Sequence, residues 1–180
     1  MSSYFRSDFS YLNIFKIISI IRKPKLIVEF GILNGDSLQA LAENNLKSKI
    51  YSYDIFDEFN GNRPHKTKII KKFKKFNNVI IQYGNYFNKN LNFKDNKIDL
   101  LHIDIANDAD VYDFFIQNYF RKLSKKGIAI LEGGSKKRDK VGWMKKYKKK
   151  KINNYLNKLN ERKYRFFTIG ELPSITIFYK

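Results

Sequence analysis

The residues best suited to bind a ligand lie in one segment, LIVEFGILNGDSLQALAE at positions 26–43. It has the pattern of a short apolar strand, an acidic residue at Glu29, a turn with Gly31 and Gly35, and an amphipathic helix. A turn of this kind presents backbone N–H groups and a helix N-terminus to a ligand. Because glycine has no Cβ, the main chain could approach that ligand closely. The segment therefore predicts a binding site at the end of a strand.

Further polar side chains lie at or just beyond the ends of other apolar runs: Asp54, Asn85, Tyr86, Asp104 and Asp108. On a strand, His102 and Asp104 point the same way, and Asp104 would lie at the carboxyl edge, where open sheets of this type bind their ligands. His102 could act as a general base. A histidine on a buried strand is more often hydrogen-bonded in the core, and we favour that interpretation.

The strand and helix patterns alternate along most of the chain. Strands are predicted at 26–30, 50–56, 79–83, 98–104 and 127–132, and helices at 37–46, 65–76 and 109–123. In the second of these helices, the predicted buried stripe is Ile69, Ile70, Phe73 and Phe76. Repeated strand–helix–strand units predict an α/β fold with a parallel sheet and helices on both faces.

The two ends of the chain have other patterns. Residues 142–159 predict one long lysine-rich helix, and 164–169 and 174–179 predict an antiparallel strand pair around a turn. An N-terminal amphipathic helix with Leu12, Phe15, Ile18 (or Ile17) and Ile21 is predicted to end at Pro24. We expect a single domain over residues 1–180, with 1–24 as a helical addition packed on it.

Composition narrows the functional classes. The absence of cysteine removes disulfides, thiolate zinc sites and a cysteine nucleophile, and it is compatible with the cytoplasm, where we expect the protein. No segment is long and apolar enough to cross a bilayer. The net charge of +19 suggests nucleic acid, but 29 of the 36 basic residues are lysine rather than arginine. We favour a lysine-coated, solvated surface.

The order of elements, together with the acid-Phe-Gly-x-x-x-Gly turn of Glu29 to Gly35, resembles the class I S-adenosylmethionine-dependent methyltransferases. The resemblance covers nearly the whole chain and is closest to the small O-methyltransferases. It implies a Rossmann-like, doubly wound sheet, mostly parallel, with an antiparallel C-terminal strand pair. The turn lacks the third glycine of a G-x-G-x-x-G dinucleotide motif, which argues against nicotinamide chemistry. A further segment resembles a subfamily signature: Leu131-Glu132-Gly133-Gly134-Ser135, followed by Arg138-Asp139 and Trp143-Met144.

The resemblance implies S-adenosyl-L-methionine as cofactor and assigns roles to individual residues. Glu29 would supply negative potential near the methionine part, and Asp54 would accept hydrogen bonds from the ribose diol. Asn85 would contact the adenine amino group, and Tyr86 or Phe87 would stack on the base. The remaining predicted cofactor contacts are Gly31, Gly35, Asp36, Ser37 and Asp104.

Asp104 and Asp108 are the predicted catalytic residues. In related O-methyltransferases, the aspartate at the position of Asp104 binds a divalent metal with an acid and an asparagine after the fifth strand. Here Glu132 could be that acid, but Gly133 stands where the amide would be expected. We therefore predict that no metal is used; if one is, it would be magnesium or a similar ion.

The leading hypothesis is methyl transfer to an oxygen, or less favourably a nitrogen, of a small-molecule or saccharide-like acceptor. RNA or DNA methylation is the second hypothesis, supported by the lysine run at 145–151. No Asp/Asn-Pro-Pro-aromatic motif follows the fourth strand to support it. A non-catalytic scaffold of the same fold is the third. The sequence identifies neither the acceptor nor the oligomeric state.

Overall fold

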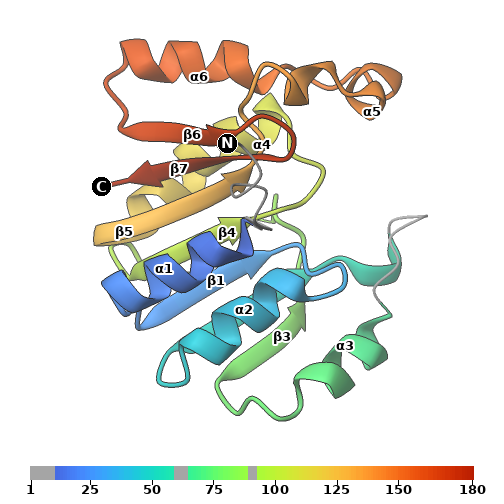
Figure 1. Ribbon diagram of the computed structural model, residues 1–180, viewed down its shortest axis with the longest axis vertical. Helices are drawn as coiled ribbons and strands as arrows, with labels where there is room; N and C mark the ends of the chain where they lie inside the picture. The colour runs from blue at the N-terminus through green and yellow to red at the C-terminus, as the bar shows by residue number, and fades with distance from the viewer. Residues whose placement is uncertain (1–10, 59–64, 89–92) are drawn as a thin grey trace, which may run out of the picture.

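The computed structural model of the protein describes residues 11–58, 65–88 and 93–180. Its seven-stranded sheet has the order β3-β2-β1-β4-β5-β7-β6 (Figure 1). The helices and strands are α1 (Leu12–Arg22), β1 (Leu26–Phe30), α2 (Asp36–Asn44), β2 (Lys49–Asp54), α3 (Lys66–Phe73), β3 (Val79–Tyr83), β4 (Ile98–Ile103), α4 (Ala109–Phe114), β5 (Leu123–Glu132), α5 (Gly142–Lys146), α6 (Ile152–Glu161), β6 (Phe166–Gly170) and β7 (Ser174–Tyr179).

The strand directions confirm the predicted fold class. Strands β1 to β5 pair in parallel, and β7 pairs antiparallel with both β5 and β6. The chain runs outward from β1 through β2 to β3, and then crosses to β4 on the other side of β1. This reversal creates a topological switch point between β1 and β4, and ligands of open α/β sheets bind at the carboxyl ends of such strands.

Helices cover both faces of the sheet (Figure 1). Successive strand residues point to opposite faces, so Ile27 packs in the core beneath α1, α2 and α3, whereas Val28 packs in the core beneath α4 and α6. Both side chains are fully buried. Packing on both faces fixes the position of each strand along its axis, and therefore the position of the polar residues at its carboxyl end.

Two helices bury a different set of residues from the one predicted. In α1, Ile14 and Phe15 are buried, whereas Ile21 is 70% exposed. The helix ends at Arg22 because Lys23 adopts a left-handed conformation just before Pro24. In α3, Ile70 is 45% exposed. Residues 1–10 of the predicted N-terminal addition lie outside the described residues.

The prediction of one long helix at 142–159 is wrong. The structure has two helices, α5 and α6, because Lys148 adopts a left-handed conformation with φ of 49°. Six lysines fall within residues 145–151, and like charges on adjacent helical turns repel one another. The carboxylate of Asp139 then accepts hydrogen bonds from Ile152 N and Asn153 N, both at 2.9 Å, and so starts α6.

The segment predicted as a helix at 109–123 is helical in three different ways. The α-helix α4 continues as a π-turn at Phe115–Tyr119 and a 3₁₀ turn at Phe120–Lys122. Strand β5 then begins at Leu123, four residues earlier than predicted. Within the described part of the chain, no helix has both the length and the apolar character that a bilayer span requires.

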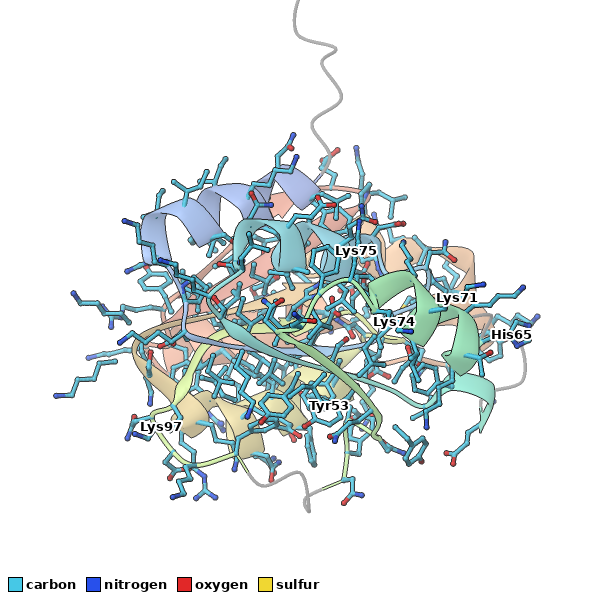
Figure 2. The ribbon with its side chains drawn as sticks, turned by 90° about the horizontal axis from the view of Figure 1, so that it is seen from below. Tyr53, His65, Lys71, Lys74, Lys75 and Lys97 are labelled. Carbon is cyan, nitrogen blue, oxygen red and sulfur yellow. The ribbon has the colours of Figure 1, made fainter. Side chains whose placement is uncertain are left out.

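Exposed lysines lie on the side of the molecule that Figure 2 shows. Figure 2 shows Lys71 on α3, Lys74 and Lys75 directly after this helix, and Lys97 on the other side of the same view. All four side chains are exposed. Tyr53, labelled between them, is only 5% exposed, because it belongs to the core on the α4 side of the sheet.

Candidate active site

The glycine turn joins β1 to α2 at the switch point. Gly31 has φ of 91°, and a Cβ placed on it would lie 2.0 Å from the carbonyl oxygen of Asp104. Gly35 has φ of 79°, and a Cβ there would lie 2.7 Å from the ring of Phe73. Both glycines are thus required by the protein's own packing. The missing Cβ of Gly31 makes room for the end of β4. That the turn also lies close to a ligand stays a prediction.

Asp54 ties the end of β2 to this turn. Its Oδ2 accepts a hydrogen bond from Ile32 N at 2.7 Å, and its Oδ1 accepts one from Phe56 N at 2.6 Å. These two bonds fix the carboxylate beside the glycine turn. The side chain is 6% exposed, at the carboxyl end of β2.

Glu29 lies beneath the turn, in a buried hydrogen-bond network. Its carboxylate accepts hydrogen bonds from Ser37 Oγ at 2.7 Å and Ser52 Oγ at 2.6 Å, and it lies 3.1 Å from His102 Nδ1. Glu29 has no exposed surface. It can therefore act on a ligand through its negative potential, while its direct contacts lock α2, β2 and β4 together.

His102 is a core residue, which agrees with the interpretation favoured from the sequence. It is 1% exposed, and its ring packs edge-on against Phe15 with 4.7 Å between centroids. Its contact with Glu29 accounts for a histidine at this depth, because buried polar groups need partners.

The predicted adenine contacts are in different environments. Asn85 is exposed after β3, and its Oδ1 accepts a hydrogen bond from Phe87 N at 3.0 Å. Tyr86 is 3% exposed and stacks on Tyr119, while its hydroxyl donates to Val111 O at 2.9 Å. The structure therefore places Tyr86 in the core, where its ring has no room for a base. Phe87, the alternative named from the sequence, is 47% exposed.

Asp36 lies at the first position of α2, where its carboxylate is 67% exposed and 3.8 Å from Lys72 Nζ. A negative charge at a helix N-terminus is favourable in itself. Ser37, one residue on, is 8% exposed and turned toward Glu29. The two neighbours thus face different surroundings.

Asp104 follows β4 directly and faces the N-terminal helix. Its Oδ2 accepts a hydrogen bond from the hydroxyl of Tyr11 at 3.5 Å. Burial raises the pKa of Asp104, an effect that the Tyr11 hydrogen bond and the charges of His102 and Arg138 partly offset. Burial also raises the pKa of Tyr11, so this hydroxyl stays protonated and can donate. A carboxylate with a raised pKa is a stronger base than an ordinary aspartate.

Asp108, the second predicted catalytic residue, has a structural role in α4. Its Oδ1 accepts hydrogen bonds from Asp110 N at 3.0 Å and Val111 N at 3.2 Å, which caps α4. Its Oδ2 lies 3.3 Å from Lys149 Nζ. Both oxygens are thus engaged away from Asp104, and this geometry argues against Asp108 as a base.

Asn107 holds the loop that carries Asp104. The side chain is fully buried and donates to Ile103 O and Glu132 O, both at 2.9 Å, while accepting from Ile105 N at 3.1 Å. Asn107 was not among the predicted site residues, since asparagine is common in loops.

Glu132 forms a two-pronged ion pair with Arg138. The Nε–Oε1 distance is 2.5 Å and the Nη2–Oε2 distance is 2.7 Å. Within the described residues, no three histidine, aspartate or glutamate side chains gather to hold a metal ion. Because the guanidinium already occupies both oxygens of Glu132, and Gly133 offers no side-chain ligand, the residues at this position do not fit the divalent ion of related enzymes.

The subfamily-like signature at 131–144 now has a structural explanation. Gly133 and Gly134 have φ of 98° and 109°, and a Cβ on Gly134 would lie 2.0 Å from Thr176 Oγ1. Arg138 N donates to Ser135 Oγ at 3.0 Å, and the guanidinium lies 4.5 Å from the centre of the Trp143 ring. Arg138 was not among the predicted site residues. The sequence signal that could have pointed to Arg138 is the scarcity of arginine, since the chain has only seven arginines.

Comparisons with known proteins agree with this geometry. A family model described as a methyltransferase domain matches residues 28–132, which is more than half of the chain. No curated protein matches the sequence.

Solved structures resemble nearly the whole chain. A Staphylococcus aureus protein provisionally described as a caffeoyl-CoA O-methyltransferase has a TM-score of 0.70 and 19% identity, over 97% of this chain and 84% of that one. The methyltransferase PaMTH1 of Podospora anserina, solved with S-adenosylhomocysteine, has a TM-score of 0.70 and 19% identity, over 94% and 77% of the two chains. TomG of Streptomyces achromogenes, an O-methyltransferase of tomaymycin synthesis solved with S-adenosylmethionine, has a TM-score of 0.64 and 11% identity, over 92% and 77%. The chain belongs to the methyltransferase-domain family and, as the sequence predicted, is a class I S-adenosylmethionine-dependent methyltransferase.

Proposed function

We propose that this protein transfers the methyl group of S-adenosylmethionine to an oxygen of a small-molecule or saccharide-like acceptor. The observation that carries the proposal is Asp104, a carboxylate of raised pKa at the carboxyl end of β4, directly against the glycine turn. A hydroxyl acceptor must lose a proton when it is methylated, and Asp104 is a base in a suitable position.

The cofactor would lie in the crevice between the ends of β1, β2 and β4. Asp54, at the carboxyl end of β2, would accept the ribose hydroxyl hydrogens. The turn from Gly31 to Gly35 and the start of α2 would face the amino-acid part, over the negative potential of Glu29. Asn85 and Phe87 would border the adenine, since both are exposed after β3.

Adenosylmethionine, when bound, supplies a methyl group on a positively charged sulfur that leaves as a neutral thioether. The protein contributes position and a base. Asp104 takes the hydroxyl proton as the acceptor oxygen forms its bond to carbon, and the hydroxyl of Tyr11 holds the carboxylate in place. The acceptor would bind between α1, the loop after Asp104 and the loop from Gly133 to Arg138.

Calorimetry with adenosylmethionine and adenosylhomocysteine tests this proposal, followed by a transfer assay with labelled methyl groups on a panel of hydroxylated acceptors. Micromolar binding of both compounds and labelled product would support it. Binding of neither compound would leave only a scaffold of the same fold.

Methylation of nucleic acid remains the second hypothesis. Of the lysine run, Lys149 pairs with Asp108 and Lys150 pairs with Asp110 at 2.7 Å, so these two charges are partly compensated. A cavity of about 720 Å³ with lysine and aromatic walls lies at the amino ends of β1 and β2, opposite Asp104. Salt-sensitive retention on a nucleic-acid column, lost when Lys148 and Lys151 are neutralised, would favour this hypothesis.

A further inference from the structure

Arg138 carries an unused donor in a buried position. The residue is 4% exposed, and among the side chains of residues 11–58, 65–88 and 93–180 its Nη1 is the buried polar atom with no hydrogen-bond partner. A guanidinium has five N–H groups, of which Glu132 accepts two. An unpaired buried donor is unfavourable, and more so when it is charged. An unpaired buried guanidinium N–H of this kind is expected at a ligand-binding site.

The ion pair of Glu132 and Arg138 lies near the proposed base. Asp104 and Glu132 follow Ile103 and Leu131, which are partners in the parallel pair of β4 and β5. Neighbouring strands are about 4.8 Å apart. Glu132, whose carboxylate binds Arg138, therefore lies beside Asp104 at the ends of these two strands. The positive charge of Arg138 accordingly contributes to lowering the pKa of Asp104 against the larger effect of burial.

The loop that carries Arg138 is held on both sides. Gly133 N donates to Ser174 O at 2.7 Å, and Thr176 Oγ1 donates to Gly133 O at 2.9 Å. On the other side of Arg138, the carboxylate of Asp139 caps α6. Trp143 covers the guanidinium and limits its contact with water. A donor fixed in this way is already oriented before a ligand arrives.

We propose that Arg138 binds an acid group of the methyl acceptor, a carboxylate or a phosphate, through Nη1 and the remaining N–H of Nη2. The two nitrogens present the end of the guanidinium, whose parallel N–H bonds match two oxygens of an oxyanion. The acceptor is then a small acidic molecule whose hydroxyl lies at Asp104.

This inference rests on the proposed function, and binding to the cofactor-loaded protein tests it. The probes are 4-hydroxybenzoate, its neutral analogue 4-hydroxybenzamide, acetate and inorganic phosphate, titrated with adenosylhomocysteine present. We expect 4-hydroxybenzoate to bind at least about tenfold more tightly than the amide, as a charge-assisted pair requires. Arg138→Lys should remove this preference, because an ammonium cannot hold Glu132 and an oxyanion in the same fork geometry.

Two further variants guard against misfolding and unspecific charge effects. The double variant Glu132→Gln with Arg138→Met removes the whole ion pair, which leaves no unpaired buried charge; it should fold and lose the preference. Arg121→Met is the matched control, because Arg121 is 69% exposed and pairs with Asp95 at 3.5 Å; it should keep the preference.

The outcomes separate the two proposals. If adenosylhomocysteine binds but none of the three anions binds better than the amide, or if Arg138→Lys keeps the preference, the acid site is refuted and the methyltransferase proposal stands. If the anions bind in an Arg138-dependent way to a protein that binds neither cofactor form, the acid site stands and the proposed function fails.

Discussion

The Oδ2 of Asp54 accepts a 2.7 Å hydrogen bond from the backbone N–H of Ile32, a residue 22 positions earlier in the chain. This bond joins the end of β2 to the glycine turn after β1. Two strand ends that the sequence predicts separately are thereby held as one structure, at the edge where this fold binds its cofactor.

Asp54→Asn should weaken adenosylhomocysteine binding by roughly tenfold to a hundredfold, because an amide has a single acceptor oxygen in place of two. Loss of an acceptor for Ile32 N or Phe56 N should also lower the free energy of unfolding by about 1–3 kcal/mol. Calorimetry and urea unfolding measure the two effects. Asp95→Asn, at an exposed loop position, is the control, and equal cofactor affinity in both variants would count against the role of Asp54.

Gly31→Ala should destabilise the protein by at least about 2 kcal/mol, since the new methyl group meets the Asp104 carbonyl oxygen and φ is positive. Gly142→Ala is the matched control, because a Cβ there has nothing within 4 Å. We expect its stability to change by less than about 1 kcal/mol, in the favourable direction. Urea unfolding of both variants decides the matter, and a fully stable Gly31→Ala would show that the turn is not packed as described.

Glu29→Ala should lower the free energy of unfolding by about 3–5 kcal/mol, because His102 and two serine hydroxyls lose a buried anionic partner. Glu43→Ala, at an exposed position on α2, should change stability by less than about 0.5 kcal/mol. Denaturant midpoints compare the two. If Glu29→Ala were as mild as the control, the network beneath the turn would not exist in solution.

Asp104→Asn should reduce the rate of methyl transfer by about a hundredfold or more, as expected when a general base is removed. Asp108→Asn should keep the rate within a few-fold and cost about 1 kcal/mol of stability through its helix cap. Rates at saturating cofactor and acceptor make the comparison. The reverse order of effects would exchange the roles proposed for the two aspartates.

The pH dependence of stability gives a second view of Asp104. A carboxyl group whose pKa is raised by folding binds its proton more tightly in the folded state. The contribution of this carboxyl group to the free energy of unfolding is therefore fully present below its pKa in the unfolded chain. It is lost as the pH rises through its pKa in the folded protein. Asp104→Asn cannot ionise, so it should equal or exceed the wild type in stability at pH 7, with the advantage vanishing at a pH near 3. Unfolding curves across this range would contradict the account if the variant were the less stable protein at neutral pH.

Most of the fold follows from local pattern. Strand β3 spans Val79–Tyr83, the residues that its apolar run predicts, and the antiparallel pair of β6 and β7 lies where the turn at 170–173 indicates. The local sequence pattern gave wrong boundaries where contacts between distant residues determine the structure. The break between α5 and α6 depends on Asp139, which caps Ile152 from 13 residues away.

The site was predictable in its outline and not in its details. Residues at strand ends, such as Asp54 and Asp104, could be placed because parallel strands bring their carboxyl ends to one edge. The burial of Tyr86 could not, since it depends on Tyr119, which is distant in sequence. Arg138 pairs with Glu132 across an irregular loop whose shape no periodicity encodes.

The central claim is that the turn after β1 and the carboxylate of Asp54 hold one cofactor molecule at the switch point of the sheet. A crystal structure with adenosylhomocysteine tests it most directly. We predict ribose hydroxyls within about 3 Å of Asp54, with the amino-acid part against residues 31–37 and the sulfur facing Asp104. Density for the ligand at another position, such as the lysine-lined cavity at the amino ends of the strands, would contradict it.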